Sequence, residues 1–260
     1  DELKAAANRG DTVAMIQHAM ENNQFRLLFQ PVISLRGDSD EHYEVLLRML
    51  NPQGEEVSPN DFIAAAKAEG LTEKIDRWVV LNSIKLLSEH RSKGHNTKLF
   101  VHISGASLQD QSLLPWLSVA LKAARLPSDA LIIQFSEPDA IEYLKQAKTL
   151  TQGLAELHCK VSLTQFGCAA NPFNTLKHLT VDFVKIDGSY TQDLSKPENL
   201  ESLKVLLASL HSQAKLTIVP YVETASTMST LWQAGVNYIQ GYFLQGPSQG
   251  MDYEFSSGNE

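Results

Sequence analysis

The spacing of hydrophobic residues divides the chain into a short opening segment and a long alternation of helices and strands. Apolar side chains at helical spacing predict a helix over residues 12–23. Apolar runs at 25–33 and 43–49 follow, separated by a polar turn, which predicts two strands joined as a hairpin. Pro31 indicates an edge or a bulge in the first strand, because proline has no N–H to donate to a ladder.

From residue 59 onward, helical and strand-like stretches alternate. Two helices are predicted first, one beginning at Pro59 and one running from Thr72 to His90. Strand-like runs then recur at 98–103, 131–135, 160–164, 182–186, 216–220 and 236–241. Helical stretches lie between them, near 111–125, 139–157, 172–178, 198–213 and 224–234. Strands that alternate with helices form a parallel sheet, so the pattern predicts an α/β fold, a TIM-like (β/α)8 barrel with an antiparallel first strand.

Composition excludes several classes of protein. The 260 residues are 43% hydrophobic and 20% charged, which is typical of a globular chain, and the net charge of −8 argues against binding to a nucleic-acid polymer. No apolar run approaches the roughly 20 residues of a membrane-spanning helix. Two cysteines are too few for a disulfide framework, which favours a cytoplasmic protein. The net charge does not exclude a small anionic ligand, because one arginine close to the ligand outweighs the net charge of the whole chain.

The ends of the chain suggest a piece of a longer protein. The first residues lack both a starting methionine and the apolar core of a signal peptide. We expect residues 1–11 to lead in from a preceding domain and residues 254–260 to form a tail. No internal repeat or low-complexity linker divides the rest, so 1–260 is expected to be one domain.

The strand at 43–49 raises the first question of function, because it carries Glu44 and Arg48 within an apolar run. The pair either forms the charged ends of a core strand or lines a site for a charged ligand. Functional residues of such barrels lie at the C-terminal ends of the strands. The residues at those ends include no nucleophile with a base, no phosphate-binding loop and no zinc-protease motif.

Segments distributed along nearly the whole chain resemble the EAL domain family. In chain order they are FQPV, EVLLR, SPNDFI, DRWVV, FVHIS, IQFSE, a QFG loop, FVKIDGSY, VPYVET and IQGYFLQGP. That family comprises cyclic di-GMP phosphodiesterases and inactive receptors related to them. Here Glu44-Val45-Leu46 stands where the family has its EAL motif, and the chain is most similar to degenerate members.

The resemblance implies that the catalytic metal site is incomplete. Active members hold two divalent ions, whose mutual repulsion of roughly 16 kcal/mol must be offset by several anionic ligands. The residues retained from the family pattern are Glu44, Glu137, Lys185 and Gln240. The residues that depart from it are His102, Gln134, Thr164, Gln165 and Pro220. Amides, a hydroxyl and a proline do not supply the carboxylate oxygens that Mg²⁺ requires, so catalysis and metal binding are not expected.

Ligand binding does not require those metals, and the residues that the resemblance assigns to it are present. Gln30 corresponds to a guanine contact, and Arg48 to the phosphate contact, which suits the planar fork of a guanidinium. Asp76 can accept from the N–H groups of a guanine, and Tyr221 can stack on a base. The predicted cyclic di-GMP site comprises Gln30, Glu44, Leu46, Leu47, Arg48, Pro59, Asp76, Tyr221, Glu223 and Gln240.

The function that follows from the resemblance is a catalytically inactive cyclic di-GMP receptor that requires no cofactor. It would relay the signal to the type IV pilus and twitching-motility machinery. The partners implied are a PilZ-type adaptor protein, the pilus assembly machinery and a second copy in a homodimer, and the location implied is the cytoplasm at the cell pole. The alternatives are an active metal-dependent cyclic di-GMP phosphodiesterase and an interaction module that has lost the ligand.

Overall fold

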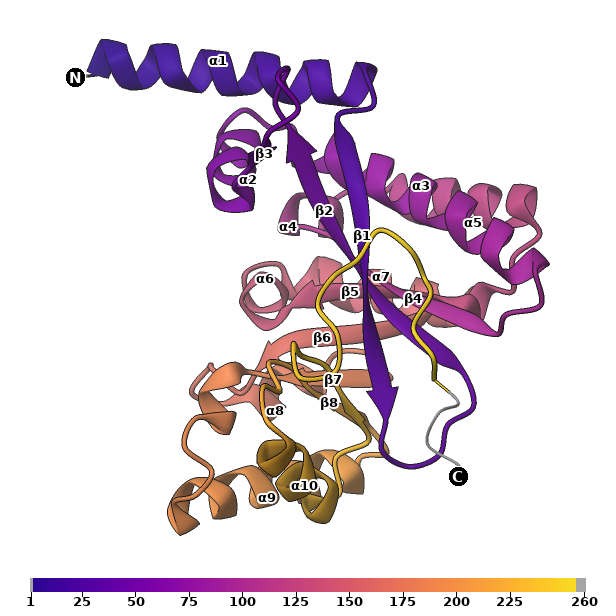
Figure 1. Cartoon of the computed structure of the whole chain (residues 1–260), viewed down its shortest axis with the longest axis vertical. Coiled ribbons are helices and arrows are strands. Elements are labelled where there is room, and N and C mark those ends of the chain that lie inside the picture. The colour runs from indigo at the N-terminus through magenta and orange to yellow at the C-terminus, as the bar shows by residue number, and fades with distance from the viewer. Residues whose placement is uncertain (1, 256–260) are drawn as a thin grey trace.

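A closed barrel of eight strands forms the centre of the computed structural model (Figure 1), which describes the backbone of residues 2–255 and the side chains of residues 11–255. The barrel strands are β1 (Phe25–Ser34), β2 (Glu41–Leu50), β4 (Thr97–His102), β5 (Leu131–Ser136), β6 (Lys160–Phe166), β7 (Phe183–Ile186), β8 (Leu216–Val219) and β9 (Tyr238–Ile239). Strand β1 pairs antiparallel with both β2 and β9, and the other barrel neighbours pair in parallel. The predicted barrel and its antiparallel first strand are therefore confirmed.

Helices alternate with the strands after β2. They are α2 (Pro59–Ala68), α3 (Thr72–Ser92), α4 (Gly105–Leu108), α5 (Leu113–Ala124), α6 (Glu137–Glu142), α7 (Leu144–Glu156), α8 (Pro172–Leu176), α9 (Pro197–Ser212) and α10 (Ala225–Ala234). Helix α1 (Glu2–Glu21) precedes β1. A two-residue strand, β3 (Glu56–Val57), pairs with the end of β2, and short 3₁₀ turns cover Ser128–Ala130 and Gly188–Thr191. None of the helices within the described residues is long and apolar enough to cross a membrane.

The structure differs from the sequence prediction at both ends and in one helix. Helix α1 begins at Glu2, so the expected lead-in is helical where it is described, and residue 1 lies outside the described part. The stretch predicted as one helix over 139–157 is two, because Tyr143 adopts φ −120° and ψ 46° between α6 and α7. Of the expected tail, residues 256–260 lie outside the described part, and the Phe255 ring packs against Tyr43 at a centroid distance of 5.3 Å.

Pro31 occupies a position where strand β1 has no ladder partner on one side. Backbone N–H groups alternate between the two sides of a strand, so those of Phe29 and Leu35 are on the same side of β1 as the nitrogen of Pro31. They point away from β2 and donate to the carbonyl groups of Ser248 and Asn237. Strand β9 pairs with β1 only at Ile33 and Ser34. The missing N–H of proline therefore falls between these contacts and costs no strand hydrogen bond.

Side chains that point into the barrel form two layers. The lower layer, near the N-terminal ends of the parallel strands, is an apolar cluster of Val32, Phe100, Ile132, Phe183, Ile218 and Tyr238. Successive side chains of a strand alternate between its faces, so the next inward position lies two residues further along. At that position, which on the antiparallel β1 lies two residues earlier, the chain has Gln30, His102, Gln134, Lys185 and Gln240, and on β8 it has Pro220. Glu44 on β2 pairs with Gln30 and belongs to the same layer. The pattern thus places a polar layer above the apolar one, at the end of the barrel where functional sites form.

Two loops of the chain approach each other closely at Gly241, directly after β9. A Cβ atom at this position would lie 2.2 Å from the carbonyl oxygen of Val222 and 2.3 Å from its nitrogen. The loops that follow β8 and β9 are joined there by hydrogen bonds from Val222 N–H to Gln240 and from Phe243 N–H to Val222. Only glycine permits this approach.

We predict that Gly241→Ala lowers the free energy of unfolding by roughly 3 kcal/mol or more, because backbone atoms must move. Gly37→Ala is the matched control, since Gly37 has a positive φ of 82° but no atom within 4 Å of its Cβ position. We expect that variant to lose only about 1 kcal/mol, the cost of the left-handed conformation. Urea unfolding measures the free energy of unfolding of both variants. Equal losses would show that the close approach of Gly241 to Val222 does not determine the cost of the substitution.

Candidate functional site

A buried ion pair lies in the polar layer of the barrel. Oε2 of Glu44 on β2 accepts hydrogen bonds from the Gln134 amide at 3.0 Å and from the ammonium group of Lys185 on β7. The Glu44 and Lys185 side chains are 14% and 9% exposed, so water solvates neither charge well. The amide of Gln134 is fixed in turn, because its oxygen accepts from the hydroxyl of Ser162 at 3.2 Å.

The two donors determine the protonation state of Glu44. Burial alone would raise the pKa of this carboxyl, but the nearby Lys185 ammonium and the hydrogen bonds from Lys185 and Gln134 lower it below the usual value. The cavity walls desolvate His102 and lower its pKa, although the carboxylates of Asp76 and Glu44 act in the opposite direction. These shifts favour the ionised form of Glu44 and the uncharged form of His102.

Asp76 on α3 is held by the segment that follows β4. Its Oδ2 accepts from the Ser104 N–H at 2.8 Å and from the hydroxyls of Ser104 and Ser107 at 2.6 Å each. Burial raises the pKa of Asp76, while these three hydrogen bonds lower it, and the net direction is upward. Because the three donors all meet Oδ2, the position of the carboxyl is fixed and Oδ1 remains as its second acceptor atom.

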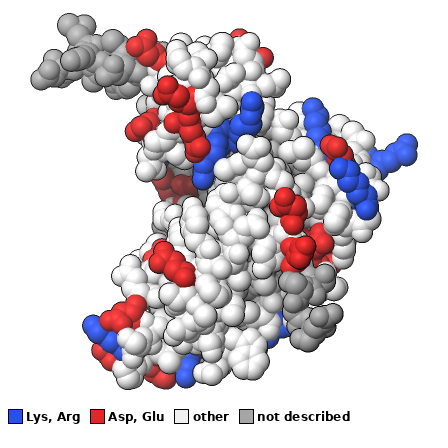
Figure 2. All heavy atoms as spheres, in the orientation of Figure 1, with Lys and Arg blue, Asp and Glu red and all other residues white. Residues whose placement is uncertain are grey.

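A cavity of about 690 Å³ opens beside β2 and brings most of the predicted site together. Its walls come from β2, α2, α3, α4 and α6, and Figure 2 shows a hollow on the side of the molecule between the elements labelled α2 and α6 in Figure 1, with basic side chains near its upper rim. The predicted site residues that line it are Glu44, Leu46, Leu47, Arg48, Pro59 and Asp76. A volume of this size is within the range of small-molecule sites, roughly 300–1,000 Å³.

Arg48 lies near the end of β2 with its guanidinium already paired. Its Nε lies 3.0 Å from the Glu56 carboxylate on β3, and its Nη1 donates to the Leu47 carbonyl at 3.0 Å. The Arg48 side chain is 22% exposed and that of Glu56 is 57% exposed, so water weakens their attraction. An anion in the cavity can therefore compete for the guanidinium.

The other predicted residues lie outside this cavity. Gln30 is the cross-strand partner of Glu44, and its Oε1 accepts from the Gln240 amide at 3.0 Å. Its own amide donates to the Gln245 carbonyl at 3.2 Å, so the last loop is tied to the polar layer. Tyr221 is 73% exposed and Glu223 is also exposed, and the structure brings neither of them to the cavity wall.

Several residues of the cavity were not predicted from the sequence. Ser104 and Ser107 fix Asp76. Ser104 directly precedes α4 and Ser107 lies in it, and this four-residue helix is too short to show periodicity. Further wall residues that were not predicted are Ile63, Lys67, Gln109, Asp139, Glu142 and Tyr143. These residues could have been found from their position in the segments that follow β2, β4 and β5, because functional sites of such barrels lie at these ends of the strands.

Comparison with known proteins gives one family and several similar chains. The EAL domain model matches residues 13–247. The cyclic di-GMP phosphodiesterase PdeF of Escherichia coli (strain K12) is 30% identical over 246 residues, which cover 93% of this chain and 33% of that protein. The signaling protein YkoW of Bacillus subtilis (strain 168) is 26% identical over 90% of this chain and 29% of its own length. The chain therefore spans about a third of the length of these relatives.

Solved structures resemble the chain over nearly its whole length. The crystal structure of the FimX EAL domain from Pseudomonas aeruginosa bound to c-di-GMP is 69% identical, with a TM-score of 0.91, and covers 95% of this chain and 100% of that one. The FimX EAL domain from Xanthomonas citri in complex with c-diGMP is 31% identical, also with a TM-score of 0.91, over 98% of this chain and 100% of that one. The first of these resembles the present chain far more closely in sequence than the second, while the two match its fold equally well.

We predict that Lys185→Met lowers the free energy of unfolding by roughly 3–5 kcal/mol at neutral pH, because the Glu44 carboxylate is left buried without its cation. Adding Glu44→Gln should restore most of that loss, since no charge then remains. The exposed Lys204 on α9 provides the control Lys204→Met, which should change little.

Acidification provides a second measurement on the same variant. Without Lys185 the pKa of Glu44 in the folded state would rise above its value in the unfolded state. The buried carboxylate then lowers the free energy of unfolding at neutral pH, and this loss shrinks as the pH falls through the raised pKa and Glu44 is protonated. Urea unfolding of Lys185→Met should thus show a smaller deficit in acid than at neutral pH. A deficit that does not depend on pH would contradict the assignment of the loss to Glu44.

Proposed function

Because the chain belongs to the EAL domain family, we propose that it is a receptor that binds cyclic di-GMP without a metal ion and does not hydrolyse it. One observation carries this proposal. The cavity beside β2 presents Arg48 and Asp76, in a chain 69% identical to a domain whose crystal structure holds c-di-GMP. The proposed contacts are Gln30, Glu44, Leu46, Leu47, Arg48, Pro59, Asp76, Tyr221, Glu223 and Gln240.

The chemistry of the cavity suits a cyclic dinucleotide. The guanidinium of Arg48 can exchange its exposed partner Glu56 for a phosphate, to which it donates two parallel hydrogen bonds. Oδ1 of Asp76 can accept from a guanine N–H while Oδ2 is held by the serines. Leu46 and Leu47 supply apolar wall for the flat faces of the base and sugar.

Gln30 and Gln240 contribute to the proposed site from the adjacent polar layer. Their hydrogen bond ties β1 to the segment after β9, and the cross-strand pairing of Gln30 places it next to Glu44. Tyr221 and Glu223 follow β8 on an exposed loop, so their contact with the ligand requires that the dinucleotide extend beyond the cavity. An exposed aromatic ring is a suitable surface for a base to stack on.

The donor set around Glu44 does not fit a pair of divalent metal ions. The groups that point at its Oε2 are an ammonium and an amide N–H, which donate hydrogen bonds and coordinate no cation. The Glu137 carboxylate accepts from the N–H groups of Gly167 at 3.2 Å and Ala169 at 2.9 Å. Hard ions such as Mg²⁺ need several carboxylate oxygens with free lone pairs, so these contacts support a receptor without catalysis.

A metal-dependent cyclic di-GMP phosphodiesterase is the second candidate function. It is favoured by the retained Glu44, Glu137, Lys185 and Gln240 and by the 30% identity with a protein named as such an enzyme. The replacement of carboxylates by Gln134, Thr164, Gln165 and Pro220, as judged from the family pattern, argues against it.

The downstream role is proposed from the resemblance to FimX-like proteins. Such a receptor would signal the binding of cyclic di-GMP to a PilZ-type adaptor protein and to the pilus assembly machinery. It would in this way regulate the type IV pilus and twitching motility. It would act in the cytoplasm, at the cell pole, with a homodimer as one arrangement.

We predict that Arg48→Ala abolishes cyclic di-GMP binding, whereas Glu44→Ala only weakens it. Arg48 supplies the charge that meets the phosphate, while Glu44 is neutralised by Lys185 and offers a polar contact. Calorimetry measures both, and Arg26→Ala is the matched control, because Arg26 on β1 is exposed and lies outside the cavity. Complete loss in Glu44→Ala as well would contradict this division of roles.

We also predict that the protein forms no linear dinucleotide from cyclic di-GMP during prolonged incubation with Mg²⁺ or Mn²⁺. Chromatography of the reaction mixture measures the product, and an active EAL phosphodiesterase run in parallel verifies the assay. Product that depends on protein and metal would overturn the receptor proposal in favour of the enzyme.

A further inference from the structure

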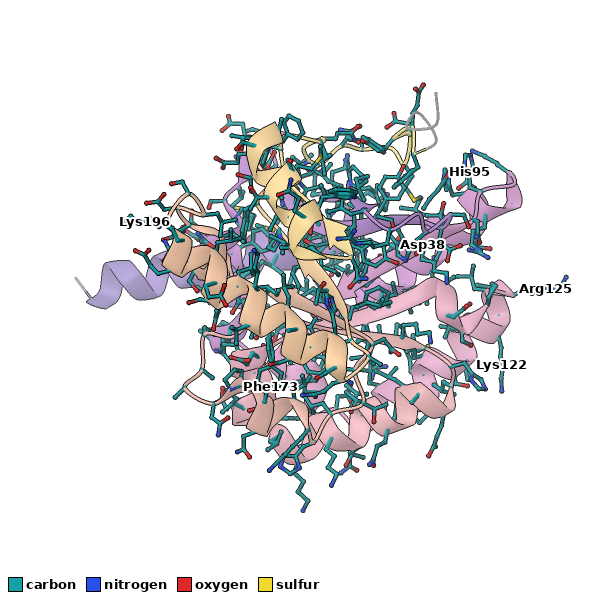
Figure 3. The ribbon with its side chains drawn as sticks, turned by 90° about the horizontal axis from the view of Figure 1, so that it is seen from below. Asp38, His95, Lys122, Arg125, Phe173 and Lys196 are labelled. Atoms are coloured by element: carbon teal, nitrogen blue, oxygen red, sulfur yellow. The ribbon has the colours of Figure 1, made fainter. Side chains whose placement is uncertain are left out.

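Three potential metal ligands meet at the end of the barrel opposite the cavity. Glu41 is the first residue of β2, His90 lies in the last turn of α3, and His95 lies in the loop that leads to β4. Figure 3 shows His95 at the margin of the molecule. The cavity is formed near the other end of β2, about 10 Å or more away at roughly 3.3 Å of rise per residue.

The donor atoms of this Glu41–His90–His95 cluster converge. Oε2 of Glu41 lies 3.3 Å from Nδ1 of His95 and 3.9 Å from Nε2 of His90, and one ligand atom from each residue lies within 4.8 Å of the others. A tetrahedral zinc site, with bonds of about 2.0–2.2 Å, has its ligand atoms roughly 3.3–3.5 Å apart. The cluster is therefore close to the spacing that a bound ion would impose. No other group of this kind occurs among the residues that the structure describes.

The rings of His90 and His95 lie side by side next to the Glu41 carboxylate. Burial and the neighbouring His95 lower the pKa of His90. Its Nε2 is buried and forms no hydrogen bond to any described residue, although it points toward Glu41. The His90 and His95 rings stack at a centroid distance of 4.0 Å and an angle of 10°, which is unfavourable for two charged rings.

The surrounding residues fix the carboxylate. The Thr97 hydroxyl donates to Oε2 of Glu41 at 2.9 Å, and the Thr97 carbonyl accepts from Arg91 at 2.7 Å. Strands β2 and β4 pair in register at Glu41 and Thr97, so strand pairing holds the backbone beneath the cluster. Outer contacts of this kind orient the ligands of known metal sites.

We propose that Glu41, His90 and His95 bind one divalent late transition-metal ion, with zinc as the ion of the cell and water at the fourth position. Imidazole nitrogen and carboxylate oxygen suit zinc, nickel and copper better than magnesium or calcium. The ion would satisfy the buried Nε2 of His90 and fasten the end of α3 to the start of β2. This site is independent of cyclic di-GMP and shares no residue with the proposed ligand site.

Zinc chloride titrated by calorimetry into protein without a polyhistidine tag or nucleotide tests the proposal. Wild-type protein should bind one zinc ion, and His95→Ala should bind it at least about tenfold more weakly. His95 is exposed on a loop, so this variant should fold, and His18→Ala provides an exposed histidine outside the cluster as the control. Wild-type affinity in His95→Ala, or no zinc binding by the wild type, would overturn the proposal.

Two further measurements separate a specific site from loss of fold. Saturating zinc should raise the melting temperature of wild type and His18→Ala by a few degrees but not that of His95→Ala, because only a ligand of the native state stabilises it. Cobalt bound to the wild type should show the visible bands of a tetrahedral complex, and His95→Ala should lack them. His95→Ala should bind cyclic di-GMP like the wild type, so failure of the zinc site and failure of the receptor proposal are distinguishable.

Discussion

The structure depends on holding one carboxylate inside a closed barrel. Glu44 is surrounded by protein, and its charge is tolerated because β5 and β7 bring the Gln134 amide and the Lys185 ammonium to the same oxygen. These three residues come from separate strands, so only closure of the barrel assembles them. The same closure sets the polar layer above the apolar cluster and so decides where a polar ligand can be bound. Both the fold and the polar layer next to the cavity therefore depend on the ion pair between Glu44 and Lys185.

In the proposed receptor, the cavity would offer the ligand one side chain that is already fixed, Asp76, and one that can exchange its partner, Arg48. Asp76 is fixed by three hydrogen bonds from Ser104 and Ser107, which spares the ligand the cost of ordering it. Arg48 is held only by a solvent-exposed partner, which a phosphate can replace. Glu44 is already neutralised by Lys185, so it neither repels a dianion strongly nor offers its oxygens freely to metal ions.

Sequence patterns predicted the fold well because apolar periodicity determines strands and helices. The strand at 25–33 and the helix from Thr72 correspond closely to β1 and α3. The break at Tyr143 was not predictable, because the periodicity continues across it while one backbone conformation changes. The short α4 was missed for the opposite reason, since four residues show no period.

The candidate site was predictable only where residues share a strand or match the family pattern. Glu44 and Arg48 are close in sequence, but the partners Lys185 and Glu56 follow from topology and turn geometry that spacing does not reveal. Tyr221 and Glu223 were predicted to contact the ligand, yet the loop after β8 leaves them exposed. The Glu41–His90–His95 cluster matched no motif, because strand pairing and the end of a helix bring it together.

The central claim is that this barrel binds cyclic di-GMP through its own side chains, without metal ions. The most direct measurement is a calorimetric titration of cyclic di-GMP into the protein in EDTA, repeated with Mg²⁺ in excess over the chelator. The account predicts one bound dinucleotide per chain and the same dissociation constant in both buffers. Binding that appears only with Mg²⁺ would contradict it.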